Sequence, residues 1–173
     1  MSNFKIIKGS CIEQNADVIV NAANKYLMPG GGICGAIFNK AGYDELNDAC
    51  NKFETPLNDG EVVKTDAFNI TNAKYIFHAI SPNFSITPNA FDKLYNAYYN
   101  SLLLLKENEL HSIAFPLISS GINGGLLENP VLESTKQCID AYNDFINKND
   151  YDIDVTLCAF SDNEYNIAIS TQK

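Results

Sequence analysis

Two glycine-rich segments carry the residues whose types and spacing could do chemistry. The first runs from Asn21 to Ala36 and contains three consecutive glycines, and the second runs from Ser119 to Gly125. Glycine has no Cβ, so a ligand can approach the backbone closely and successive N–H groups can point into one concavity. A helix beginning just after the first segment would add its positive end. Because each segment follows an apolar strand, the pair could clamp a diphosphate from both sides.

The charge balance decides how such an anion could be held. The chain has 12 basic residues, all of them lysine, against 21 carboxylates, which gives a net charge of −9. Sequence-independent binding to nucleic acid needs a basic face that releases counterions from phosphates, so no nucleic-acid partner is expected. There is also no G-x-x-x-x-G-K-[ST], the motif that supplies a phosphate-binding lysine. An anionic ligand must therefore be held mainly by backbone N–H groups and helix N-termini.

Cysteine usage and hydropathy predict where the protein is found. The five cysteines are an odd number, widely spaced and without a C-x-x-C pair, which favours a reducing compartment over a disulfide framework or a zinc site. No run approaches the ~18 apolar residues of a membrane span. The first residues do not resemble a signal peptide, because no basic stretch precedes an apolar one. We therefore expect a cytoplasmic protein with no membrane association.

Apolar runs and amphipathic segments alternate along the 173 residues. A chain of this length can bury about 70% of its unfolded surface, so one sizeable core is expected. Period-two and continuous apolar runs predict strands at 4–7, 17–21, 60–65, 75–80, 112–118 and 154–160. Helices are predicted over 36–53, 91–107, from Pro130 to about 147, and after a capping box at 161–164. This alternation predicts a largely parallel or mixed sheet covered on both faces, with the ligand beyond the carboxyl ends of the strands.

Three ordered runs resemble the signature of the macrodomain family, whose members are modules that bind ADP-ribose. They are Ile19 to Asn24, Gly30 to Ile37, and Phe115 to Ile122 followed by Gly124. The likeness extends from about Gly9 to Ile169 and is nearest to viral replicase macrodomains and their cellular hydrolase relatives. It implies a single macrodomain over residues 1–173. The fold implied is a three-layer α/β/α sandwich with a mixed, mostly parallel central sheet.

The resemblance also implies a ligand site. The diphosphate would lie between the two glycine segments, adenine would pack on Phe160, and Asn24 would be the catalytic residue that binds the distal ribose and positions a water. Asn21 would support the loop through backbone bonds. The implied ligand-binding residues are Ser10, Cys11, Asn21, Ala23, Gly30, Gly31, Gly32, Ile33, Ser119, Ser120, Gly121, Ile122, Asn123, Gly124 and Phe160. No metal and no cofactor is implied.

Three positions depart from the family pattern. Ser10 stands where relatives carry an aspartate that accepts a bond from the adenine amino group. Cys34 replaces an aspartate that often precedes the helix in the hydrolases, and a thiol of pKa ~8.5 is a poor general base. Asn123 replaces an aromatic residue of the second loop, which leaves the distal ribose less covered.

Two functions from different classes remain open at this point. The first is an enzyme that hydrolyses mono-ADP-ribose from modified proteins, or deacylates O-acyl-ADP-ribose. The second is a non-catalytic reader of ADP-ribose. Asn24 and the triple glycine favour the first, whereas Cys34 and Asn123 favour the second. The expected partners are ADP-ribose and ADP-ribosylated proteins, and the expected state is a monomer.

Several residues have a purely structural alternative. Phe160 could be a core residue that closes the last strand, and Asn24 could be a turn asparagine. His78 lies in an apolar run and is expected to be a satisfied core histidine rather than a catalytic one. The tyrosines at 95, 98 and 99 have helical spacing and are expected to form core or rim.

Overall fold

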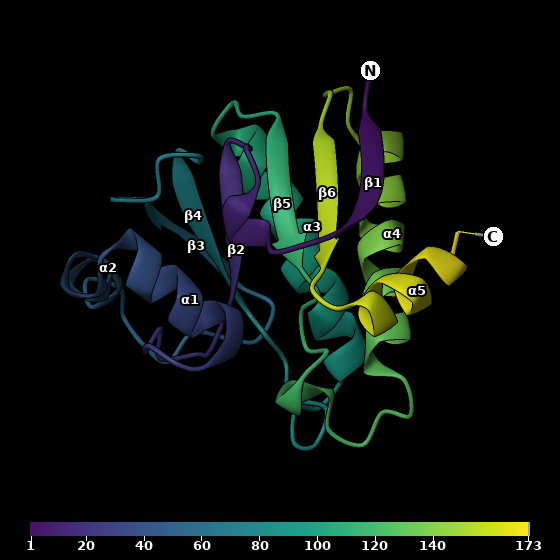
Figure 1. The fold of residues 1–173 in the computed structure, drawn as a ribbon, viewed down its shortest axis with the longest axis horizontal. Helices are drawn as coiled ribbons and strands as arrows, with labels where there is room; N and C mark the ends of the chain where they lie inside the picture. Colours follow the sequence, from purple (N-terminus) through teal and green to yellow (C-terminus); the bar gives the residue numbers. More distant parts are fainter. Residues whose placement is uncertain (173) are drawn as a thin grey trace.

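The computed structural model describes residues 1–172 and places one mixed sheet between two layers of helices (Figure 1). The strands are β1 (Asn3–Lys8), β2 (Val18–Ala23), β3 (Val62–Asp66), β4 (Tyr75–Ile80), β5 (Ser112–Pro116) and β6 (Asp154–Ala159). The α-helices are α1 (Gly32–Ala41), α2 (Tyr43–Cys50), α3 (Ala90–Glu107), α4 (Pro130–Lys148) and α5 (Asp162–Ser170). Two short 3-10 helices, η1 (Cys11–Glu13) and η2 (Ile122–Gly124), follow β1 and β5.

The sheet has the strand order β1-β6-β5-β2-β4-β3. All neighbouring strands are parallel except β3 and β4, which are antiparallel. The carboxyl ends of β1, β6, β5, β2 and β4 therefore meet at one edge of the sheet. The predicted three-layer sandwich with a mixed, mostly parallel sheet is confirmed.

Alternating side chains divide the core between the two faces of the sheet. In β2, Val18 and Val20 belong to the apolar cluster shared with α3, α4 and α5. Ile19, between them, belongs to the cluster shared with α1 and α2. Because both sets are fully buried, β2 is a continuous apolar run, as expected for a central parallel strand covered on both faces.

The largest difference from the predicted elements lies between residues 32 and 53. The sequence pattern predicts one helix from Ala36, whereas the structure has two, beginning at Gly32 and broken at Gly42. Gly42 has φ 110°, which a residue with a side chain rarely adopts, and this turns the chain between the helices. The earlier start is missed because the glycine-rich first turn has no apolar periodicity.

The predicted caps of the last two helices are confirmed. The Asn129 side chain accepts a hydrogen bond from the Leu132 N–H at 3.3 Å, with Pro130 as the first residue of α4. Ser161 and Glu164 form the reciprocal capping box at the start of α5. None of the helices in residues 1–172 combines the length and the apolar character needed to cross a bilayer.

Candidate ligand-binding site

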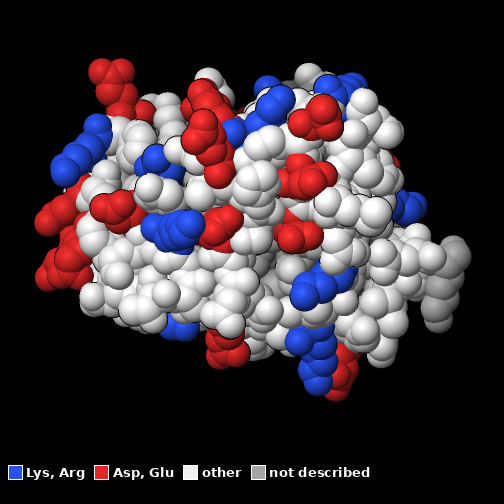
Figure 2. Space-filling view, turned by 90° about the horizontal axis from the view of Figure 1, so that it is seen from above, with Lys and Arg blue, Asp and Glu red and all other residues white. Residues whose placement is uncertain are grey.

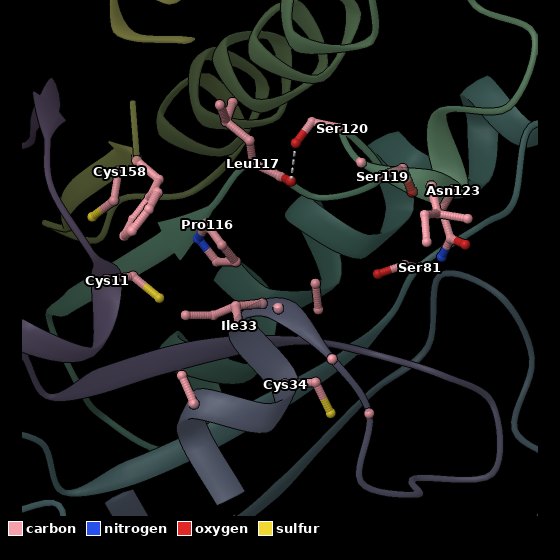
Figure 3. Close-up of a pocket in the computed structure, with 18 of the residues that line it drawn as sticks. Cys11, Ile33, Cys34, Ser81, Pro116, Leu117, Ser119, Ser120, Asn123 and Cys158 are labelled. Atoms are coloured by element: carbon pink, nitrogen blue, oxygen red, sulfur yellow. Dashed lines mark hydrogen bonds between the residues drawn. The ribbon is translucent and has the colours of Figure 1, made fainter. Parts of the chain in front are cut away.

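A cavity of about 780 Å³ lies along the edge where the five parallel strands end. This volume is within the range typical of small-molecule sites. Figure 3 shows that its walls come from both glycine segments and from the strand ends between them. The lining residues are Gly9, Ser10, Cys11, Ala22, Ala23, Asn24, Gly30, Gly31, Gly32, Ile33, Cys34, Ala36, Ser81, Pro116, Leu117, Ser119, Ser120, Gly121, Ile122, Asn123, Cys158, Phe160 and Glu164.

One end of the cavity, beyond β1 and β6, is mainly apolar. Cys11 and Cys158 lie at this end in Figure 3, and Ser10 adds a hydroxyl. Phe160 follows β6 directly, and 75% of its surface is exposed. The alternative interpretation of Phe160 as a core residue is therefore wrong. An exposed ring on a cavity wall offers a face on which a planar base can stack.

The middle of the cavity is rich in backbone N–H groups on the side of the first glycine segment. Gly31 is the N-cap of α1, and the first helical hydrogen bond is donated by Gly35 to the Gly31 carbonyl at 3.3 Å. The N–H groups of Gly32, Ile33 and Cys34 precede that bond and donate to no oxygen within residues 1–172. A helix N-terminus of this kind attracts anions through these N–H groups and the helix dipole.

Three glycines of the cavity wall have open space where a side chain would lie. A Cβ placed on Gly31, Gly32 or Gly121 would meet no atom within 4 Å. Gly32 also has φ 57°, in the left-handed region. In contrast, a Cβ on Gly35 would come 2.5 Å from the Gly30 carbonyl oxygen, so that glycine permits the loop to pack on the helix. The open positions are those at which a ligand could reach the backbone.

Hydrogen bonds from side chains hold the backbone of the second glycine segment in place. The Tyr98 hydroxyl accepts a hydrogen bond from the Ile118 N–H at 3.0 Å and contacts Ser134 at 2.7 Å. Ser119, at φ 59°, donates from its hydroxyl to the Pro82 carbonyl at 2.7 Å. These bonds fix the backbone just before the residues from Ser120 to Asn123, which line the cavity. Tyr98 is fully buried, which confirms its predicted place in the core.

Asn24 lies at the other end of the cavity, beyond β2, and its amide is held by its own loop. The side-chain oxygen accepts from the N–H groups of Tyr26 and Met28, both at 3.1 Å. The side-chain nitrogen donates one proton to the Met28 carbonyl at 2.8 Å. Both acceptor positions are therefore occupied, and one N–H remains for a ligand. Asn24 thus braces the turn, as its structural alternative expects, and still presents a fixed donor at the cavity wall.

Ser81 is a cavity residue that the sequence analysis does not identify. It follows β4, and Figure 3 shows it at the same end as Asn123. Its hydroxyl is buried without a hydrogen-bond partner within the described residues. A buried hydroxyl without a partner costs free energy, so a ligand hydroxyl at this end would find a donor and an acceptor. Its place just after a strand of the parallel set is the signal that could have found it.

A buried polar chain lies beneath the first glycine segment. His78 is fully buried, and its Nδ1 lies 3.1 Å from Asn21 Nδ2 while its Nε2 lies 2.9 Å from Thr65 Oγ1. The predicted core role of His78 is confirmed. Asn21 also donates weakly to Cys34 Sγ at 3.8 Å. Asn21 therefore supports the loop through side chains, not through the backbone bonds that the sequence analysis expects.

Neither Cys34 nor His78 is suited to be a base. Burial raises the pKa of the Cys34 thiol, so the thiolate is disfavoured. Burial also lowers the pKa of His78 to about 4, and the ring is neutral near pH 7. His78 is sealed from the cavity, so it acts as a structural residue.

The free energy of unfolding should depend on pH through His78. Its pKa is about 4 in the folded protein against 6.5 when unfolded, so the unfolded state binds the extra proton first. His78 therefore does not lower the free energy of unfolding above pH 6.5. Below that pH it lowers the free energy of unfolding by about 1.4 kcal/mol per pH unit, until the pH reaches about 4. Urea unfolding of the wild type and His78→Gln across this range would measure it. If the free energy of unfolding has the same pH dependence in both proteins, His78 does not titrate differently in the folded and unfolded states.

The charges around the cavity are few. Glu164 is the one charged side chain among the lining residues, and no lysine is among them. The opposite face of the molecule, where the parallel strands begin, is shown in Figure 2. Lysines lie among carboxylates on that face and do not form a basic patch. Within residues 1–172, no group of three or more histidine, cysteine or acidic side chains gathers as a metal site would require. An anion in the cavity would therefore meet N–H groups and no cation of the lining.

Most of the predicted ligand-binding residues line the cavity, and two do not. Asn21 is buried behind the wall, in the polar chain described above. Gly124 is buried too, and a Cβ there would lie 2.7 Å from Pro130, so this glycine allows the second loop to pack on α4. The carboxylate Glu164 and the strand-end residues Gly9, Ala22, Pro116 and Cys158 are lining residues that the sequence analysis does not identify.

The α/β/α sandwich and its cavity beyond the strand ends define a class of proteins that bind small ligands at the edge of a parallel sheet. The chain belongs to the macrodomain family, because the family model described as Macro domain matches residues 20–130. A macro domain-containing protein of Xanthomonas campestris is 33% identical, with 98% of this chain and 97% of that protein covered.

Solved macrodomain structures are similar over almost the whole chain. The Oceanobacillus iheyensis macrodomain with ADP is 33% identical and has a TM-score of 0.89, covering 99% of this chain and 90% of the other. The Trypanosoma brucei macrodomain in complex with ADP-ribose is 28% identical and has a TM-score of 0.85, covering 99% of this chain and 69% of the other.

Proposed function

We propose that this macrodomain binds ADP-ribose across its cavity and releases it from modified proteins. The observation that carries the proposal is the order of three zones along one edge of the sheet. An exposed ring stands at one end, and N–H groups that donate to no oxygen within residues 1–172 lie in the middle. Asn24 and Ser81 provide polar groups at the other end. ADP-ribose has the same order of base, diphosphate and ribose. The related macrodomains described above were solved with ADP and ADP-ribose, which supports the assignment.

The middle zone alone would bind weakly. A hydrogen bond to a charged group is worth about 1.5–3 kcal/mol, so four would contribute roughly 6–12 kcal/mol in total. Association costs about 4–15 kcal/mol, which consumes most of that gain. Stacking of adenine on Phe160 should therefore decide whether the ligand binds well.

Phe160→Ala is expected to weaken ADP-ribose binding about tenfold, since base stacking on an aromatic ring is worth ~1–3 kcal/mol. The melting temperature should hardly change, because 75% of the ring is exposed. Isothermal titration calorimetry and thermal unfolding measure the two effects. Ile86→Ala is a matched control, because Ile86 is 78% exposed and does not line the cavity. Equal affinities of the wild type and Phe160→Ala would contradict the stacking role.

Release of ADP-ribose would rest on positioning. The remaining N–H of Asn24 would hold a water near the anomeric carbon of the distal ribose, and a ligand phosphate would accept the water's proton. The water oxygen would bond to the anomeric carbon as the bond from that carbon to the protein side chain breaks, and the proton taken up by the phosphate would pass to the departing side chain. Positioning of this kind can supply much of a barrier without a strong side-chain base.

A second candidate, a reader without turnover, is favoured by one observation. The Asn24 end of the cavity has no side chain that could act as a base, because burial raises the pKa of Cys34 and His78 is sealed away. A titration with ADP-ribose followed by a turnover assay on an ADP-ribosylated protein separates the candidates. Binding with release supports the hydrolase, binding without release supports the reader, and no binding refutes both.

We also infer a monomer in the cytoplasm. All five cysteines are free and buried, which fits a reducing compartment. Size-exclusion chromatography with light scattering should give one mass near 19.1 kDa. A stable dimer would contradict this inference and leave the proposed ligand unaffected.

A further inference from the structure

Glu164 contributes a negative charge to a cavity proposed to hold a diphosphate. It is the one charged residue of the lining, and a carboxylate close to phosphate would oppose binding. The carboxylate must therefore face a part of the ligand that has no negative charge. Since a carboxylate only accepts hydrogen bonds, that part must also offer a donor.

The structure holds Glu164 at the apolar end of the cavity. It is the third residue of α5, the helix that begins two residues after Phe160 and packs against β1 and β6. Its Oε1 accepts a hydrogen bond from the Ser161 N–H at 3.0 Å, and its own N–H donates to Ser161 Oγ at 3.1 Å. The capping box therefore fixes this side chain in the first turn of the helix. Its Oε2 accepts no hydrogen bond within residues 1–172.

The other polar side chain at this end is less selective. Ser10 has a hydroxyl, which can donate or accept by rotating, so it accommodates either kind of group. Glu164 alone is restricted to accepting. Glu164 would therefore select, among bases stacked on Phe160, those that present a hydrogen-bond donor to its carboxylate.

We propose that Glu164 is a specificity-determining residue that accepts a hydrogen bond from the exocyclic amine of the adenine base. This inference rests on the proposed function, because it requires the base to lie at the Phe160 end. The carboxylate favours a ligand that carries this amine over one that lacks it.

The test compares two ligands against two proteins by calorimetry at constant ionic strength. The ligands are ADP-ribose and its analogue with purine as the base, which has hydrogen in place of the amine and is otherwise unchanged. The proteins are the wild type and Glu164→Gln. In the variant the amide oxygen can still accept from the Ser161 N–H, so the cap is kept, and the amide nitrogen offers only donors to the ligand.

The wild type is expected to prefer ADP-ribose over the purine analogue by about tenfold, the ratio given by one hydrogen bond to a charged group. In Glu164→Gln this preference should disappear, because two donors then face each other. Asp162→Asn is the matched control. It removes one charge from the same helical turn, at a residue that is 80% exposed and does not line the cavity, and it should keep the preference.

The other outcomes overturn the inference in distinguishable ways. If Glu164→Gln weakens both ligands equally, the carboxylate binds a ribose hydroxyl and the assignment to the amine is wrong. If the variant keeps the wild-type preference, Glu164 does not select the base. If the wild type binds neither ligand, the proposed function itself fails, and the inference fails with it.

Discussion

Gly31→Val is expected to weaken the binding of ADP-ribose by more than about tenfold without unfolding the protein. Gly31 has φ −89° and ψ −175°, an extended conformation that valine readily adopts. A Cβ there meets no protein atom within 4 Å, so the side chain would extend into open space beside the N–H groups of α1. The valine side chain would crowd a diphosphate bound to those N–H groups and weaken its hydrogen bonds. Calorimetry measures the affinity, and thermal unfolding checks the fold.

A graded series makes this prediction sharper. Gly31→Ala adds one carbon in the same position and should weaken binding less than Gly31→Val does. A melting temperature close to that of the wild type must accompany both variants, because the space is open in the folded protein. If Gly31→Val binds ADP-ribose as tightly as the wild type, the diphosphate does not lie against this segment.

Asn24→Ala is expected to slow the release of ADP-ribose from a modified protein by about 100-fold or more. The affinity for free ADP-ribose should change by less than about tenfold, since one N–H of many is lost. The physical reason is that Asn24 presents one fixed donor to the cavity, held there by its bonds to Tyr26 and Met28. Single-turnover release and calorimetry give the two quantities.

Asn24 also holds its loop in place, so a control is needed that changes a neighbouring side chain of the loop and keeps the bonds of Asn24. Tyr26→Ala removes a side chain that is 53% exposed and does not line the cavity, and it keeps the Tyr26 N–H that Asn24 accepts. It should leave both release and binding unchanged. Equal release by the wild type and Asn24→Ala would show that this residue does not position the water.

Much of the fold can be predicted because the apolar periodicities are strong and the caps are explicit. Strand β4 and helix α3 are each predicted to within a residue, and the cap residues Asn129 and Ser161 act as expected. The break at Gly42 is missed because its neighbours continue a helical apolar pattern, with Ala41 and Leu46 both buried. Only the backbone angle at Gly42 reveals the turn.

The site is predicted less completely, for a different reason. Glycine segments are visible in a sequence, so the N–H groups of the middle zone are expected from it. Ser81 and Glu164 reach the cavity through the strand order and through the direction of α5, which local patterns do not encode. The same holds for Asn21, whose partner His78 lies 57 residues away on the neighbouring strand.

The most direct test follows backbone amide resonances of ¹⁵N-labelled protein during a titration with ADP-ribose. If backbone amides bind the diphosphate, the signals of Gly32, Ile33 and Ile122 should move downfield and saturate together, because their N–H groups have no acceptor within residues 1–172. Lysine side chains should be unaffected, since no lysine within residues 1–172 lines the cavity. Saturable binding without a shift of these three amide resonances would show that their N–H groups do not bind the diphosphate.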